Sequence, residues 1–162
     1  MLYRVRQFIQ ALLAGAKHID YYWVSEVLPP NLYKLYLEMP RYEQVHSYRV
    51  AQDIARSSND PYLLQAALLH DVGKVYGKHH MSMLGRCLAV ILDKFSPRLL
   101  RCLAREHYPF WSFYLYIHHP EIGADKILRA GGDQQVAYII RNHHTRTHDT
   151  AISLLHKVDS SR

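Results

Sequence analysis

Cysteine, long hydrophobic runs and clustered charge are all scarce in this chain of 162 residues. The two cysteines, Cys87 and Cys102, are too few for a disulfide scaffold, so we interpret them as free thiols. The longest apolar stretches, Cys87–Leu92 and Pro109–Ile117, are far shorter than the roughly 20 residues that cross a bilayer, which predicts no membrane span. Residues 1–10 lack an apolar run followed by a cleavage site, so we expect a cytoplasmic protein.

The basic charge of the chain is dispersed. The formal net charge is +6, yet lysine and arginine form no run of five or more, so nucleic-acid binding is possible but not favoured over a small anionic substrate. Hydrophobic residues make up 49% and charged residues 21%, as in ordinary globular proteins, which excludes disorder and predicts one domain with a proper core. The oligomeric state stays open.

Apolar residues recur at helical spacing along most of the chain, and no stretch alternates like a strand. We therefore predict an all-α, single-domain helical bundle of about 8–10 helices, with residues 1–40 as accessory helices packed on a main domain at 41–162. The stretch 75–116 reads as helical without chemically active residues. Candidate helices cover 3–13, 19–28, 32–39, 40–56, 61–70, 83–93, 97–107, 120–129, 134–142 and 150–159.

The stretch LLQAALLHDVGK, residues 63–74, ends an apolar helix with two adjacent metal-binding side chains, His70 and Asp71. Neighbours on a helix point about 100° apart, so this pair can share a cation only where the helix ends or bends. We expect Gly73 to supply that bend through its tolerance of unusual backbone angles. Lys74 lies four residues after His70 and can share its face.

Further candidate ligands lie at inward positions or helix ends. His119 precedes Pro120, which we expect to open a helix with His119 at its cap, and Gly123 leaves the next turn bare for close approach. Buried aspartate is costly unless it is paired or coordinated, which favours a metal role for Asp71 and Asp159. The complete candidate set is His46, His70, Asp71, His119, His143, His144 and Asp159.

These residues and their flanking sequences, HSYRVAQDIA, AALLHDVGK, HHPEIGADKIL and LLHKVD, resemble the HD-domain metal-dependent phosphohydrolases from Arg41 to Asp159. The resemblance implies a helical domain with one or two divalent transition-metal ions. It assigns one ion to His46, His70, Asp71 and Asp159, and a second to His119, His143 and His144, with Asp71 bridging. Imidazole and carboxylate ligands suit iron, manganese, zinc, cobalt or nickel.

Two subfamily signatures are absent. Thr145–Thr150 stands where cyclic-di-GMP phosphodiesterases of this superfamily have a glycine-tyrosine-proline motif, and Val75-Tyr76 stands where the nucleoside monophosphatase branch has a glutamate. Cyclic di-GMP and nucleoside monophosphates are therefore disfavoured as substrates.

The resemblance implies hydrolysis of a phosphoester or phosphoanhydride in a small, nucleotide-like substrate by a metal-activated hydroxide. We assign catalytic roles to Asp71 and to Lys74, which would neutralise charge on the phosphoryl oxygens, and we consider Arg49 and Lys78 as phosphate contacts. One alternative is a non-catalytic signalling module that senses a metal or ligand. A second alternative is nucleic-acid binding through the basic surface.

Overall fold

The computed structural model describes residues 18–77 and 79–161, and the helix predicted at 3–13 lies outside this part. Within these ranges the chain forms nine α-helices, one short 3₁₀ helix and one two-stranded hairpin, so the all-α prediction is confirmed. The helices are α2 (Tyr21–Val27), α3 (Pro30–Glu38), α4 (Arg41–Ala55), α5 (Pro61–Leu69), α6 (Met83–Phe95), α7 (Pro97–Leu103), α8 (Trp111–Arg129), α9 (Gln134–Asn142) and α10 (Thr150–Ser161). None of the helices in the described ranges has the length and hydropathy needed to cross a membrane.

Capping side chains fix where several of these helices begin. Asp60 accepts hydrogen bonds from the backbone N–H groups of Tyr62 and Leu63, which would otherwise lack partners at the start of α5. Asp133 caps α9 and Asp149 caps α10 in the same way. These three helix starts agree with the candidate helices at 61–70, 134–142 and 150–159.

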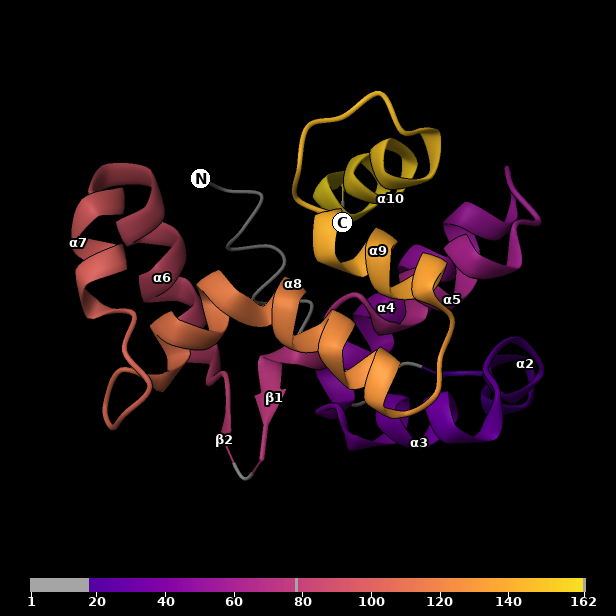
Figure 1. Ribbon diagram of the computed structural model, residues 1–162, viewed down its shortest axis with the longest axis horizontal. Helices are drawn as coiled ribbons and strands as arrows, with labels where there is room; N and C mark the ends of the chain where they lie inside the picture. Colours follow the sequence, from indigo (N-terminus) through magenta and orange to yellow (C-terminus); the bar gives the residue numbers. More distant parts are fainter. Residues whose placement is uncertain (1–17, 78, 162) are drawn as a thin grey trace.

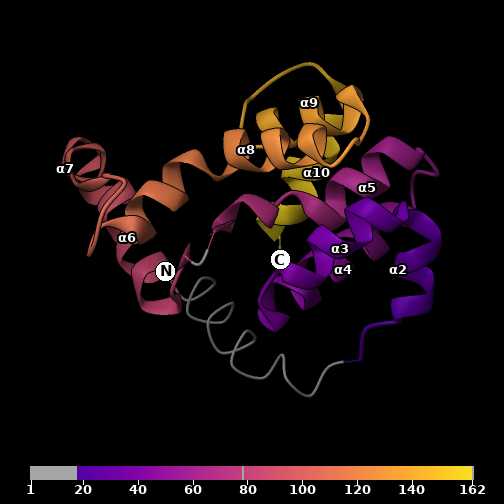
Figure 2. The ribbon, with the colours of Figure 1, turned by 60° about the horizontal axis from the view of Figure 1, so that its bottom comes forward.

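One hydrophobic core joins most of the elements. It includes residues of α2 and α3, such as Val24 and Leu32, together with residues of α4, α5, α9 and α10. Helix α8 packs against α9 and against the 3₁₀ helix (Val72–Lys74) that follows α5. Figures 1 and 2 show that α6 and α7 lie at the far end of α8, away from this core. The seven candidate ligands lie on or directly after α4, α5, α8, α9 and α10.

The stretch 75–116 is not purely helical. Val75–Tyr76 (β1) and His79–His80 (β2) form an antiparallel hairpin with Val75 opposite His80. Strands of two residues are too short to show alternation, so the sequence pattern could not reveal them.

Pro120 does not open a helix, contrary to the prediction. Helix α8 runs without interruption from Trp111 to Arg129 with Pro120 inside it, so His119 lies in mid-helix rather than at a cap. Proline removes the backbone hydrogen bond to the carbonyl four residues earlier, that of Tyr116. The Nδ1 atom of His119 lies 2.9 Å from that carbonyl oxygen and replaces the missing donor. The helix therefore tolerates the proline, and the histidine ring gains an anchor.

Gly73 is required for close packing, not for an unusual backbone angle. Among the described glycines only Gly77 and Gly131 have positive φ. A Cβ atom on Gly73 would lie 2.0 Å from the backbone oxygen of His119 and 2.7 Å from the backbone nitrogen of Gly123. The absence of both side chains lets the segment after His70-Asp71 touch α8, which confirms the close approach expected at Gly123.

We predict that Gly73→Ala lowers the free energy of unfolding by about 3 kcal/mol or more, because backbone atoms of α8 must move to admit the methyl group. Chemical denaturation measures the change. Gly77→Ala is the matched control: no atom lies within 4 Å of its added Cβ, and only its φ of 57° opposes the substitution, at about 1–2 kcal/mol. Equal stability of Gly73→Ala and the unchanged protein would contradict this packing.

Candidate metal centre

The first group of candidate ligands comes from three helices far apart in the sequence. His46 lies in α4, His70 directly follows α5, and Asp159 lies near the end of α10. One ligand atom from each lies within 4.8 Å of the others. Asp159 Oδ1 is 2.8 Å from His46 Nε2 and 3.5 Å from His70 Nε2. Two imidazoles and a carboxylate converge on one point, which is a donor set that suits a divalent transition metal.

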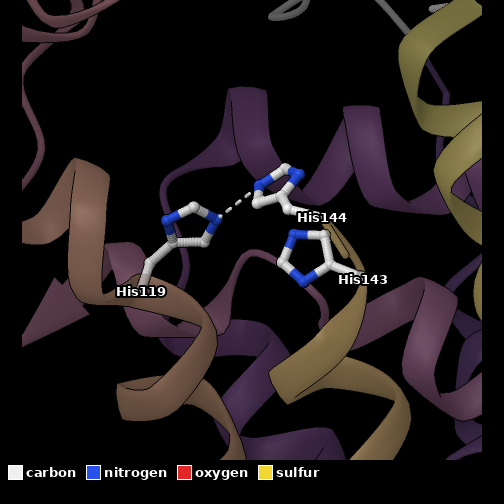
Figure 3. Close-up of side chains that lie close together, drawn as sticks. All are labelled: His119, His143 and His144. Atoms are coloured by element: carbon white, nitrogen blue, oxygen red, sulfur yellow. Dashed lines mark hydrogen bonds between the residues drawn. The ribbon is translucent and has the colours of Figure 1, made fainter. Parts of the chain in front are cut away.

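The second group consists of three histidines. His119 projects from α8, and His143 and His144 follow α9 (Figure 3). One ring nitrogen from each lies within 4.8 Å of the others, and the Nε2 atoms of His119 and His144 are 3.2 Å apart. His119 and His143 are buried, whereas His144 is more exposed. Three imidazoles are the number of protein ligands in many catalytic zinc sites, in which water or substrate supplies the fourth ligand.

Asp71 lies between the two groups. Its Oδ2 atom is 3.5 Å from His70 Nε2 and 3.9 Å from His46 Nε2, while its Oδ1 atom is 3.9 Å from His119 Nε2. The side chain is 3% exposed, so its charge is shielded from bulk water. Each carboxylate oxygen thus faces a different histidine group.

Three of the rings are held by backbone carbonyls one turn earlier. The Nδ1 atoms of His70, His119 and His143 lie 2.9, 2.9 and 2.6 Å from the carbonyl oxygens of residues 67, 116 and 140. Because a carbonyl only accepts, each Nδ1 must carry the hydrogen, which directs Nε2 toward the centre. The Nε2 atoms of His70 and His143 are buried and have no hydrogen-bond partner. A metal ion is the partner that such atoms fit.

Lys74 lies beside the candidate ligands, and its partner is Asp71, three residues earlier, rather than His70. Its ammonium group is buried and lies 2.6 Å from Asp71 Oδ2 and 3.4 Å from Glu43 Oε1. Arg86 NH1 lies 3.0 Å from the same Glu43 oxygen. A chain of alternating charges therefore runs from α6 to the candidate ligands.

Glu43 and Arg86 were missed by the sequence reasoning. Glu43 is 1% exposed and lies one turn before His46 on the inward face of α4. A charged residue on an otherwise inward stripe was the available signal, because buried carboxylates need partners. Arg86 lies in the stretch 75–116, for which the sequence predicts no chemically active residue, and its ion pair with Glu43 links that stretch to the candidate centre. Its contact with Glu43 depends on how α6 packs, which local sequence does not encode.

The two weaker phosphate candidates have different outcomes. Lys78 lies outside the described residues. Arg49 lies in α4, three residues after His46, and is half-buried. Its assignment as a phosphate contact stays a prediction.

The two histidine groups differ in electrostatics. Burial alone would lower the pKa of His70, but the carboxylates of Asp71 and Asp159 outweigh it and raise that pKa to about 9. Burial, together with the nearby His144 and His70, lowers the pKa of His143 to about 3. Burial and the neighbouring His143 likewise lower the pKa of His119. Without metal the first group therefore holds a proton at neutral pH, and the second group is neutral.

The pKa of Asp71 also follows from its neighbours. Burial alone would raise it, but Lys74 and His70 outweigh that effect and keep the pKa well below its ordinary value. The carboxylate is therefore ionised over the whole neutral range, as a metal ligand must be.

These shifts predict the stability of chelator-treated protein. Between pH 6.5 and pH 9 the folded chain keeps a proton on His70 that the unfolded chain has lost, so stability should fall as pH rises through this window. Below pH 6.5 His143 becomes protonated in the unfolded chain but stays neutral in the folded chain. Stability should therefore also fall as the pH decreases toward 3. The maximum should lie near pH 6.5.

Urea denaturation across this range, with and without added Zn²⁺, measures the effect. Zn²⁺ should remove the alkaline loss, because the ion replaces the proton on His70. A gain in the stability of chelator-treated protein between pH 6.5 and pH 9 would contradict the assignment of a proton to His70.

Comparison with known proteins identifies the family of the chain. Neither curated proteins nor solved structures yield a match. The family model of the HD domain matches residues 44–158, which is more than half of the chain. The matched range contains six of the seven candidate ligands, and Asp159 directly follows it. The chain therefore belongs to the HD-domain superfamily of metal-dependent phosphohydrolases.

Proposed function

We propose that this chain is a metal-dependent phosphohydrolase that cleaves a phosphoester or phosphoanhydride in a small, nucleotide-like substrate. The observation that carries the proposal is the position of Asp71, whose two oxygens face two separate groups of metal-competent side chains. Such a carboxylate can bridge two ions about 3.5–4 Å apart, the arrangement of two-metal hydrolytic sites.

In this proposal His46, His70 and Asp159 hold one ion, and His119, His143 and His144 hold the other. Bound ions would supply a nucleophile by lowering the pKa of water toward about 7, and would attract the phosphate oxygens. The carbonyl-anchored rings present their Nε2 atoms in fixed positions, so little reorganisation is needed on binding. As a ligand shared by both ions, Asp71 would hold them beside the same substrate.

Lys74 would offset the negative charge on the phosphoryl oxygens. Its ammonium group is already held at the centre by Asp71 and Glu43. Because Glu43 also contacts Arg86, it keeps two cations beside the site without leaving them unpaired. Lys74 and Arg86 offset two of the three carboxylates, Glu43, Asp71 and Asp159, so two bound divalent ions would make the site net positive and suit it to an anionic substrate.

We predict that Lys74→Met lowers kcat about 100-fold while the bound metal is retained, because charge stabilisation is lost without loss of a ligand. Steady-state kinetics together with metal analysis of the same sample measures both quantities. Lys157→Met, which changes an exposed lysine of α10, is the control and should leave kcat unchanged. An unaltered kcat in Lys74→Met would remove the catalytic role.

The experiment that tests the proposal combines elemental analysis of the purified protein with a substrate panel. The panel contains nucleoside mono-, di- and polyphosphates and cyclic dinucleotides. We expect two ions per chain and release of phosphate, or of a phosphorylated product, from at least one class. Two bound ions with no turnover of any class would favour the non-catalytic sensing module instead.

A further inference from the structure

Helix α6 presents an apolar face that is exposed within the described ranges 18–77 and 79–161. Its exposed apolar side chains are Leu84, Leu88, Ile91 and Phe95, which are 71%, 45%, 48% and 71% exposed. They are spaced by four, three and four residues, so they fall on one side of the helix. We call these four residues the α6 seam.

The opposite side of α6 faces the body of the molecule. Gly85 is buried, and a Cβ atom there would lie 2.2 Å from Ser112 Oγ of α8. Arg86 reaches Glu43, and Asp93 accepts a hydrogen bond from the Tyr116 hydroxyl of α8. The orientation of α6 is therefore fixed by contacts on its other side, and the seam is held outward.

The seam has the pattern of a helix-pairing surface. Alternating spacings of three and four residues place apolar side chains along a coiled-coil contact line. By helical periodicity Lys94 is the charged residue of α6 nearest to the seam, whereas Arg86 and Asp93 lie on the opposite side. Two copies of the seam can therefore face each other without placing charged residues on the contact line.

An antiparallel pairing around a two-fold axis makes the seam complementary to itself. With the axis between Leu88 and Ile91, each Leu88 lies beside the partner's Ile91, and each Leu84 lies beside the partner's Phe95. Every seam residue then has an apolar neighbour, as an isologous interface requires.

The apolar surface on the seam is sufficient for a small dimer interface. With roughly 150–200 Å² for each fully exposed side chain, the four residues present on the order of 400 Å². Two copies with their flanking atoms would bury about 1,000 Å², near the lower limit for a specific protein interface. A patch of about 400 Å² is the size of the largest apolar patch on a typical monomer, which is often a binding site.

We propose that the α6 seam is a dimerisation face and that its occupant is the seam of a second copy of this chain. This proposal does not depend on catalytic activity. It does connect to the candidate metal centre, because the same helix carries Arg86, and pairing would hold α6 and thus Arg86 against Glu43.

Sedimentation of the full chain at about 1–200 µM tests the proposal, because mass action makes a weak dimer depend on concentration. We expect the mass to approach twice the 19.0 kDa of one chain. Leu88→Glu and Ile91→Glu should each return it to the monomer with unchanged circular dichroism, since both residues are half-exposed. Tyr138→Glu is the control: Tyr138 is 50% exposed on α9, away from the seam, and the variant protein should remain dimeric.

A second measurement locates the contact. Leu88→Cys in a chain with Cys87→Ser and Cys102→Ser should form a cross-linked dimer with a short bis-maleimide, whereas Tyr138→Cys in the same background should not. A monomer at every concentration would overturn the proposal. So would a monomer whose seam binds anionic phospholipid vesicles in a sedimentation assay. A dimer that survives both glutamate variants would also overturn it.

Discussion

Asp71→Ala should abolish phosphate release, with a loss of kcat of about a thousand-fold or more, equivalent to about 4 kcal/mol of activation free energy. Asp71 is the side chain that faces both histidine groups, so its removal takes a ligand from each ion of the proposed pair. We also expect the metal content to fall well below two ions per chain. Kinetics and elemental analysis of the same preparation measure both effects.

The fold should survive this substitution. Lys74 loses its 2.6 Å partner, but Glu43 remains within 3.4 Å and keeps the buried cation paired. Far-ultraviolet circular dichroism should therefore be unchanged. Asp125→Ala is a suitable control, because Asp125 is an exposed carboxylate whose partner is Arg141 on the surface. An Asp71→Ala protein that keeps both its metal and its rate would rule out the bridging role.

His143→Ala should reduce the metal content from two ions per chain to one and lower kcat about 100-fold or more. His143 is buried, and its Nε2 atom has no hydrogen-bond partner, so this atom is available to bind a metal ion. Removal leaves His119, His144 and the shared carboxylate of Asp71, so the second ion loses one of its three imidazoles and should no longer compete with buffer for binding. The first group, with His46, His70 and Asp159, should retain its ion.

Titration with a metal-sensitive dye, together with elemental analysis, separates the two sites. His148→Ala changes an exposed histidine only five residues away and should leave two ions bound. If His143→Ala lost both ions, the two groups would form a single centre. If it lost none, the histidines of the second group would be structural.

Sequence reasoning was most successful where the signal is local. The caps at Asp60, Asp133 and Asp149 depend on side chains within three residues of the groups they bond, so helix starts were readable. The His70-Asp71 pair followed by Lys74 was readable for the same reason. Membership of the HD-domain superfamily followed from motifs whose order is preserved along the chain.

Errors occurred where a neighbour in space decides the outcome. Pro120 resembles a helix start, but the His119 ring supplies the donor that the proline lacks, and packing of α8 on α9 stabilises the continuous helix. Gly73 resembles a flexible hinge, but its backbone is ordinary, and the contact with α8 explains the glycine. Glu43 became visible as part of the centre only through Lys74 and Arg86.

The sequence by itself determined which side chains can ligate a cation, the helical class of the domain and the superfamily, because these depend on residue type, spacing and order. The resemblance had already divided the candidate ligands into two sets, but only the tertiary structure decided that each set comes within a few ångströms and that each oxygen of Asp71 lies near a different set. It alone also decided that the α6 seam is exposed among the described residues. The physical reason is that metal ligation and burial depend on distances of a few ångströms between residues more than a hundred positions apart, such as His46 and Asp159. Those distances result from helix packing, which no local pattern contains.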